Sequence, residues 1–213
     1  MIDLKEIVAR LEARAVLSGL LDCHIRGLHS IVLEERADGS LLRIFYATAR
    51  ANMDRLFSHN GHFQLGAHNH DKELSFKVLH GQVYNVSLDF AADLDQRAMN
   101  LFRYPFRSAL TSGAFGLGPA DGVRMLLSIQ PLDSVTMRVT QIHTVLIASS
   151  KAVWVVDEGP RDPLAEKFIY SPRPDLTLDS TDLYRPMKPG VIANICDEIL
   201  LSIYAFFPEA LRA

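Results

Sequence analysis

Two histidines, His68 and His70, stand one residue apart in the sequence GAHNHDKELSFKVLHGQVYNV, at the start of a run with the composition of a β-strand. Side chains two positions apart on a strand point to the same face, so this spacing directs both imidazoles at one point. Neutral imidazole nitrogens bind iron, zinc, copper, nickel and manganese to differing degrees. The pair therefore predicts part of a metal site.

A third histidine, His143, lies in a second strand-like sequence, SVTMRVTQIHTVLIASSKAVWVV, where apolar residues alternate around it. Three imidazoles on a rigid scaffold would hold one metal ion and leave coordination positions open for water, substrate or dioxygen. Taken singly, each histidine is better explained as a polar strand residue or a hydrogen-bonded core histidine. The hypothesis of a metal site therefore depends on all three histidines in this order along the chain.

The order of these residues resembles the two sequence motifs of the cupin family. The first motif has HxH, three or four residues, a glutamate, six residues and a glycine, and here the HxH pair is followed by an apolar strand and Gly81. Counting back from Gly81 places Leu74 at the glutamate position, with Glu73 one residue earlier. The second motif contributes one histidine on a later strand, which corresponds to His143, although the glycines of that motif are missing here.

This resemblance implies a metal site formed by His68, His70 and His143, with Glu73 as the alternative fourth ligand. We predict a three-histidine site, because Leu74 and every second residue after it form one apolar face, and a one-residue slip of the strand would reverse that face. The resemblance favours iron as the metal, with zinc, nickel or manganese as alternatives.

Strand-like segments dominate the part of the chain that must position these histidines. Residues 30–35 and 41–48 have the pattern of two strands joined by a tight turn at Asp38 and Gly39, a pair that tolerates the positive φ angles of hairpin turns. Further strands are predicted at 62–70, 75–79, 82–88, 123–129, 134–147 and 152–156. Many short strands separated by turns indicate a sandwich or a barrel, and the resemblance implies an all-β core in the form of a cupin-like jelly-roll barrel.

Helical patterns flank these strands, and we predict a single cupin-like domain over 1–213. Apolar residues at helical spacing predict an N-terminal helix over 1–22, with Asp3 as its N-cap. The barrel is assigned to 30–157, with a helical or irregular insertion near 90–121. Residues 158–213 are expected to hold a proline-rich segment that wraps the barrel, followed by an apolar C-terminal helix that ends at Pro208.

The composition argues against several classes of protein. With 213 residues, of which 48% are hydrophobic and 22% charged, the chain is long enough to bury a sizeable core. A formal net charge of -3 disfavours nucleic acid as a partner. The two cysteines, Cys23 and Cys196, are far apart, which argues against a disulfide framework or a thiolate zinc site. The charged N-terminus and the lack of a long apolar stretch predict no signal peptide and no membrane span, so a cytoplasmic location is expected.

Other candidate residues lie outside the two motifs. Arg103, Tyr104 and Arg107 in the insertion could bind an acidic substrate at a pocket mouth, because guanidinium groups bind carboxylates through two parallel hydrogen bonds, and a solvated face is the alternative for them. Three further histidines fall in or beside predicted turns, where solvated roles are expected. His24 and His29 belong to neither motif.

The resemblance also carries the predicted function. The first hypothesis is a metal-dependent enzyme acting on a small molecule, namely an iron-dependent dioxygenase that resembles the three-histidine thiol dioxygenases of the cupin superfamily. The alternative is a non-enzymatic cupin that binds or senses a small molecule, and a third is a sugar isomerase or epimerase, because one fold hosts unrelated functions. Cupins are often dimers, and the apolar run ILLSIYAFF near the C-terminus also predicts a homodimer.

Overall fold

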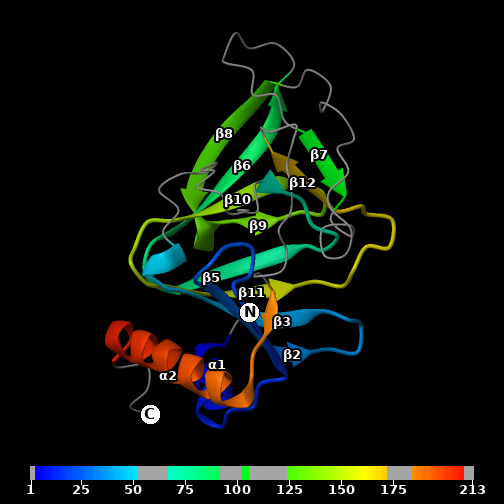
Figure 1. Ribbon diagram of the computed structural model, residues 1–213. Coiled ribbons are helices and arrows are strands. Elements are labelled where there is room, and N and C mark those ends of the chain that lie inside the picture. Colours follow the sequence, from blue (N-terminus) through cyan, green and yellow to red (C-terminus); the bar gives the residue numbers. More distant parts are fainter. Residues whose placement is uncertain (1–2, 52–66, 92–101, 106–123, 172–183, 209–213) are drawn as a thin grey trace.

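Two antiparallel sheets and two α-helices make up the part of the chain that the structure, a computed structural model, describes (Figure 1). The described residues are 3–51, 67–91, 102–105, 124–171 and 184–208. The seven-stranded sheet has the order β13 (Arg185–Pro186), β1 (Ser18–Leu21), β2 (Leu28–Glu35), β3 (Leu41–Ala47), β11 (Ala152–Glu158), β5 (Leu74–His80) and β9 (Thr136–Met137). The six-stranded sheet has the order β7 (Phe102–Pro105), β12 (Phe168–Ser171), β4 (Ala67–His68), β10 (Ile142–Ile147), β6 (Val83–Ala91) and β8 (Arg124–Pro131). The predicted all-β core is therefore confirmed.

The predicted hairpin at 30–48 forms β2 and β3, which lie next to each other in the seven-stranded sheet. Its turn contains Gly39 at a φ of +78°, a left-handed conformation that glycine adopts without steric cost. The side chain of Asp38 accepts a hydrogen bond from the backbone N–H of Ser40 at 2.9 Å, which closes the turn. The local sequence is sufficient to specify this element.

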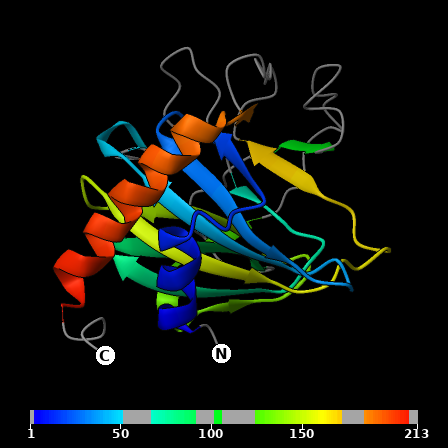
Figure 2. The ribbon, with the colours of Figure 1, turned by 90° about the horizontal axis from the view of Figure 1, so that it is seen from below.

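The seven-stranded sheet buries both of its faces, and the two helices cover one of them. On β3, Leu42, Ile44 and Tyr46 pack against the helices, because alternate residues of a strand point to the same face. The helices are α1 (Leu4–Glu12) and α2 (Pro189–Phe206), and Figure 2 shows α2 crossing the strands diagonally with α1 beside it. This layer shields the outer face of the sheet from water.

A second core fills the space between the two sheets. Phe45 on β3 and Trp154 on β11 stack with ring centroids 5.4 Å apart, and Phe76 and Leu74 on β5 join the same cluster. Ile147 on β10 contributes from the six-stranded sheet. Each such side chain stabilises the fold by about 1.5–3 kcal/mol when it is fully removed from water. The two sheets are therefore held face to face by apolar packing.

The N-terminal helix is shorter than the range 1–22 that we predicted. It ends at Glu12, Arg14 adopts a left-handed φ of 54°, and residues 18–21 form β1 instead. The apolar spacing predicted a helix here, but pairing with β2 favours a strand, since β1 gains backbone hydrogen bonds to the neighbouring strand. Gly19 also suits a close contact, because a Cβ atom at this position would lie 2.6 Å from the sulfur of Met187.

Two other predicted segments also differ from the structure. The predicted strand 134–147 is two strands, β9 and β10, because Thr140 between them adopts a left-handed φ of 70°. The segment after 158 does more than wrap the core, since it supplies β12 to one sheet and β13 to the other. Of the predicted strand 62–70, residues 67–70 are described and 67–68 form β4, and most of the predicted insertion near 90–121 lies outside the described residues.

The C-terminal helix packs on its own chain. Ile195, Cys196, Ile199 and Ile203 of α2 are buried against the sheet and α1. This packing covers Ile199, Leu200 and Ile203 of the run on which the homodimer was predicted, whereas Leu201 and Phe206 are exposed, and the homodimer stays a prediction. By length and mean hydropathy, 1.3 over 18 residues, α2 also meets the criterion for a helix that could cross a membrane, so the expectation that no stretch comes near a span does not hold for α2.

Candidate metal centre

His68 and His143 lie directly opposite each other on neighbouring strands. His68 is the last residue of β4, and its backbone position pairs with His143 on β10. Opposite residues on antiparallel strands project to the same face with their Cβ atoms about 4.5–5.5 Å apart. The two rings accordingly have centroids 4.8 Å apart, and both side chains are buried. Strand register therefore brings together two histidines that are far apart in sequence.

His70 completes the cluster from just beyond the end of β4. Its carbonyl accepts a hydrogen bond from the backbone N–H of Thr140 at 3.1 Å, which ties the segment to the turn before β10. Its Nε2 lies 2.9 Å from Nε2 of His143, and one ring nitrogen of each of the three histidines lies within 4.8 Å of the other two. Metal–nitrogen bonds of about 2.0–2.1 Å place neighbouring ligand atoms about 2.9–3.4 Å apart, so small ring rotations would bring all three to one ion.

Asn85 fixes the orientation and tautomer of His143. The Oδ1 atom of Asn85 lies 2.7 Å from Nδ1 of His143, while its Nδ2 donates to Oγ of Ser87 at 2.7 Å. An amide oxygen only accepts hydrogen bonds, so Nδ1 of His143 carries the proton. Its Nε2 then presents a lone pair to the cluster. Such support of the non-coordinating nitrogen is typical of histidines that bind metals.

Burial favours the neutral form of two imidazoles of the cluster, those of His70 and His143. Removal from water lowers the pKa of His143 well below its ordinary value, and the neighbouring histidines lower it further. Burial likewise lowers the pKa of His70, with His68 and His143 adding to the effect. A neutral imidazole is the form that binds a metal ion. The local electrostatics therefore disfavour protons at this site and leave nitrogen lone pairs available.

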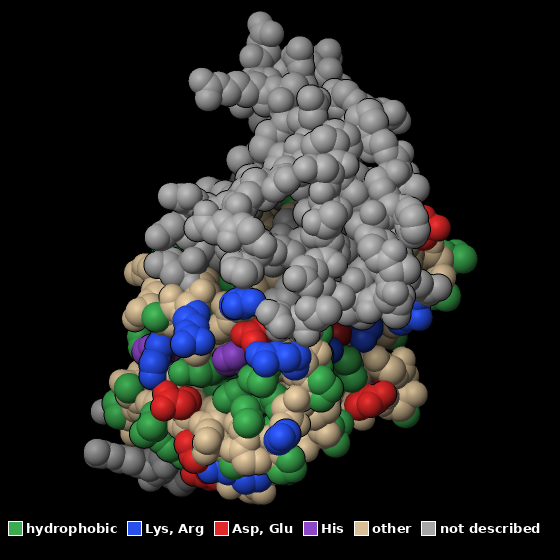
Figure 3. All heavy atoms as spheres, in the orientation of Figure 1, with side chains coloured by type: hydrophobic (Ala, Val, Ile, Leu, Met, Phe, Trp, Pro, Cys, Tyr) green, Lys and Arg blue, Asp and Glu red, His purple; other side chains and the backbone are tan. Residues whose placement is uncertain are grey.

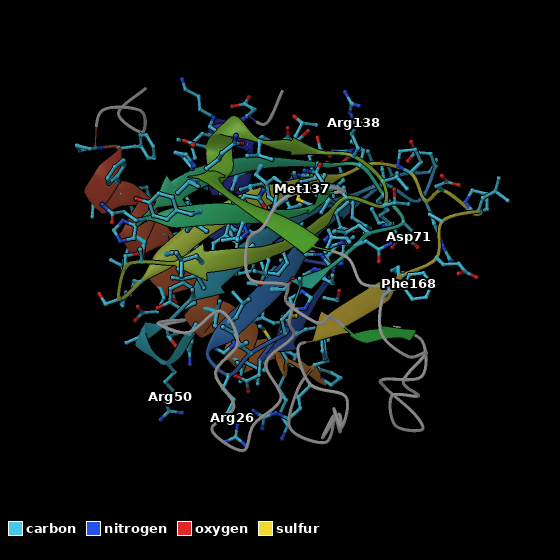
Figure 4. The ribbon with its side chains drawn as sticks, turned by 90° about the horizontal axis from the view of Figure 1, so that it is seen from above. Arg26, Arg50, Asp71, Met137, Arg138 and Phe168 are labelled. Carbon is cyan, nitrogen blue, oxygen red and sulfur yellow. The ribbon has the colours of Figure 1, made fainter. Side chains whose placement is uncertain are left out.

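The segment after His68 is held by residues about a hundred positions later. Asn69 Nδ2 donates to the carbonyl of Glu166 at 2.8 Å, and Asn69 Oδ1 accepts from the backbone N–H of Phe168 at 2.6 Å. The carboxylate of Asp71 lies 2.8 Å from Nε of Arg161. Asp71 and Phe168 are labelled on the same side of the molecule in Figure 4. These contacts fix the backbone on both sides of His70.

Glu73 lies outside the histidine cluster. Its side chain is exposed, and its carbonyl accepts a hydrogen bond from the backbone N–H of Gly159 at 2.8 Å. Leu74 and Phe76, in contrast, are buried between the sheets. The structure thus has the histidines together and the glutamate away from them, which matches the geometry of the three-histidine alternative.

A fourth histidine, His24, belongs to the site and was not identified from sequence. Its ring stacks on His68 with centroids 5.2 Å apart, and its Nδ1 lies 2.7 Å from the hydroxyl of Tyr184. Both His24 and Tyr184 have left-handed backbone conformations, with φ of 67° and 55°. Non-glycine residues rarely adopt this conformation, and such strain concentrates at functional sites. The turn is held by Asp22, whose carboxylate accepts from the N–H of Gly27 at 2.7 Å.

A cavity of about 310 Å³ adjoins the histidine cluster and lies between the two sheets. This volume is at the lower end of the range of about 300–1,000 Å³ found for small-molecule sites. Apolar and aromatic side chains such as Phe45, Phe76 and Trp154 line much of it. Cys23 also lines the cavity, and burial raises the pKa of its thiol to about 12, which leaves it protonated and unreactive near neutral pH.

The residues predicted to bind an acidic substrate are only partly described. Arg103 and Tyr104 lie on β7, and Tyr104 is opposite Ile169 of β12, which is in turn opposite His68. Their backbone is therefore two strands away from the cluster in the same sheet. Arg107 lies outside the described residues. On the surface, basic side chains are interspersed with acidic and apolar ones over the described part of the face in Figure 3.

No family model matches the chain, and no curated protein matches it at a significant level.

Proposed function

We propose that the chain binds one divalent first-row transition metal ion through His68, His70 and His143, and that it is a metal-dependent enzyme acting on a small molecule. The observation that carries this proposal is the convergence of three ring nitrogens within 4.8 Å of one another at the edge of a cavity. The residues fit such an ion, because burial lowers the pKa of His70 and of His143 and Asn85 directs a lone pair of His143 into the cluster.

Two further features support a cupin-type jelly roll as the scaffold. The two facing sheets enclose an apolar core, and the histidines project from the six-stranded sheet toward the cavity. Gly81 adopts a φ of +83° in the turn between β5 and β6, as expected for the glycine that closes the first cupin motif. A Cβ atom there would lie 2.4 Å from the carbonyl oxygen of Lys151. The turn therefore requires glycine.

The reaction we favour is that of an iron-dependent dioxygenase resembling the three-histidine thiol dioxygenases. Iron held by these three histidines would supply open coordination positions for a substrate and dioxygen. The chain contributes the imidazole ligands, the orientation of His143 and a cavity lined largely by apolar surface beside them. Zinc, nickel or manganese in place of iron would favour a different reaction.

The cavity walls distinguish between the alternatives. A sugar isomerase or epimerase needs many polar partners for hydroxyl groups, whereas stacked Phe45 and Trp154 with Phe76 make a largely apolar wall. A non-enzymatic cupin that binds or senses a small molecule fits the same cavity. Dioxygenase and binding protein therefore remain the two hypotheses to separate.

Elemental analysis of protein made without a polyhistidine tag tests the metal site. We expect about one transition metal ion per chain, lost from His68→Ala, His70→Ala and His143→Ala, because each change leaves two protein ligands. The matched control is Glu73→Gln, which should keep its metal, since this side chain is exposed. A wild-type protein that holds no metal and takes up no added iron, zinc, nickel or manganese would contradict the proposal.

Oxygen uptake separates the dioxygenase from the binding protein. Iron-loaded protein is mixed with a panel of small thiols and carboxylic acids, and dioxygen consumption is followed with an electrode. A dioxygenase consumes one dioxygen per product without an added reductant, and His143→Ala abolishes that consumption. Binding of a panel member to iron-loaded protein without any oxygen uptake would favour the binding protein instead.

A further inference from the structure

Arg43 lines the same cavity as the three histidines, and its guanidinium group is only partly engaged. It lies on β3 with 20% of its side chain exposed, and its Nε is 2.9 Å from Oε1 of Glu158. Its Nη1 donates to Oγ of Ser30 at 3.3 Å, a long contact. Within the described part of the chain, Nη2 donates no hydrogen bond. A largely buried guanidinium with an unused N–H group at a cavity wall is suited to bind an anion.

Both carboxylates on the described cavity wall are already engaged by basic side chains. Oε2 of Glu158 lies 3.1 Å from the ammonium of Lys72, so each oxygen of this carboxylate has a cationic partner. Asp71, with 4% of its side chain exposed, is held by Arg161 at 2.8 Å and by Lys167 at 3.3 Å. Among the described lining residues, no other acidic side chain is present to receive a ligand's ammonium group.

Much of the remaining wall near Arg43 is apolar, although Cys23, His24 and Tyr184 also line the cavity. Val156 on β11 is directly opposite Arg43, and the stacked pair of Phe45 and Trp154 comes next along the same two strands. Phe76 continues this wall toward the cluster, with its ring centroid 6.3 Å from that of His143. A ligand body that spans the cavity would therefore contact aromatic and aliphatic surface, with a cation near one part of it and the histidines near another.

We infer that this cavity binds a small monocarboxylate with an apolar, preferably aromatic, body and no ammonium group. The carboxylate pairs with Arg43, the body lies along Phe45 and Trp154, and the reacting part reaches the histidine cluster. This inference rests on the proposed function, because it names the substrate class of that site. It excludes amino acids as preferred ligands, since an ammonium group would lose its water without gaining a carboxylate partner.

Three probes with one carbon skeleton test the inference by isothermal titration calorimetry on purified wild-type protein of measured metal content. The probes are 3-phenylpropanoate, the neutral 3-phenylpropanamide and the zwitterion L-phenylalanine. We expect 3-phenylpropanoate to bind at least about tenfold more tightly than the other two, as loss of a charge-assisted hydrogen bond or burial of an unpaired charge implies. Equal binding of the amide, or of phenylalanine, would overturn the inference.

Substitution of the arginine localises the effect. Arg43→Met should weaken 3-phenylpropanoate binding by about 10- to 100-fold and leave amide binding unchanged. The matched control is Arg36→Met, which also removes an arginine–carboxylate pair, here with Asp157 at 2.8 Å, but outside the cavity lining. Arg36→Met should bind 3-phenylpropanoate like the wild type. Undiminished binding by folded Arg43→Met would overturn the inference.

Two further readouts keep the outcomes distinct. If Arg43→Met does not fold, Arg43→Lys is used instead. It keeps a positive charge beside Glu158 but loses the planar guanidinium group, so it should still weaken the binding of 3-phenylpropanoate several-fold. Metal content is measured on the same samples and should not change in either variant. If protein without metal binds 3-phenylpropanoate more tightly than the other two probes, the inference is supported while the metal proposal fails. Metal-loaded protein with no such preference would overturn the inference alone.

Discussion

Replacing Asn85 by leucine should weaken metal binding, and in the metal-free protein it should cost only the strain of fitting two larger methyl groups at this buried position. Leucine keeps the branched shape of asparagine with bulkier methyl groups, and it removes the acceptor 2.7 Å from Nδ1 of His143 at a position that is 1% exposed. In the metal-free protein His143 can move its proton to Nε2 and donate to Nε2 of His70, 2.9 Å away, so no buried donor is left unpaired. When a metal ion occupies Nε2, His143 cannot move its proton there, so the proton stays on Nδ1.

The magnitude follows from the group that is left unpaired. In the metal-bound variant the N–H of His143 Nδ1 is buried without an acceptor, which costs about 1–3 kcal/mol. That free energy corresponds to a loss of about 5- to 150-fold in metal affinity, which brackets the 10- to 100-fold losses typical of such supporting residues. We therefore expect the Kd for zinc to rise by about one to two powers of ten.

Competition titration with a chromogenic zinc chelator measures this change directly, and urea unfolding in excess chelator measures the metal-free stability. Asn85→Asp is the matched control, because a carboxylate keeps the acceptor for Nδ1 and should preserve the affinity. Ser87, which would lose its donor in the leucine variant, still accepts from Gln141 Nε2 at 3.3 Å. Zinc binding by Asn85→Leu as tight as that of the wild type, or an equal loss in Asn85→Asp, would refute the reasoning.

Three other predictions concern stability and assembly. In excess chelator, the free energy of unfolding should fall as the pH is lowered from 7.5 to 5.5. The reason is that burial lowers the folded-state pKa values of His24, His70 and His143, so below about pH 6.5 the unfolded chain binds protons that the folded chain does not. Each histidine contributes up to about 1.4 kcal/mol per pH unit to this loss. Equal urea midpoints at both pH values would contradict this. Gly81→Ala should destabilise far more than Gly39→Ala, because both need a left-handed φ but only at Gly81 would the new Cβ atom meet a carbonyl, at 2.4 Å. Thermal unfolding of the two variants compares them, and equal losses would show that the clash is relieved elsewhere. Light scattering should report twice the chain mass of 23.8 kDa, and a monomer at micromolar concentration would rule out the homodimer.

Much of the strand content was predictable because its causes are local. Short runs rich in apolar residues and bounded by turn residues predicted the regions of β2, β3, β5 and β11, and the positive φ of Gly39 agrees with the predicted hairpin turn. The end of the N-terminal helix was not predictable in the same way. Leu20 and Leu21 suit either a helix or a strand, and pairing of residues 18–21 with β2 decided between them.

The sequence by itself determined that His68 and His70 share a direction, because their spacing matches the two-residue period of a strand. Only the tertiary structure decided that His143 lies opposite His68, that Asn85 orients it, and that His24 stacks on His68. The hydroxyl of Tyr184, 160 positions later, contacts His24 in the same way only through the fold. Arg43 likewise reaches the same cavity only through the order of strands in its sheet. Spacing along one strand is set by covalent geometry, whereas contacts between distant strands are set by register and by burial of the faces between them.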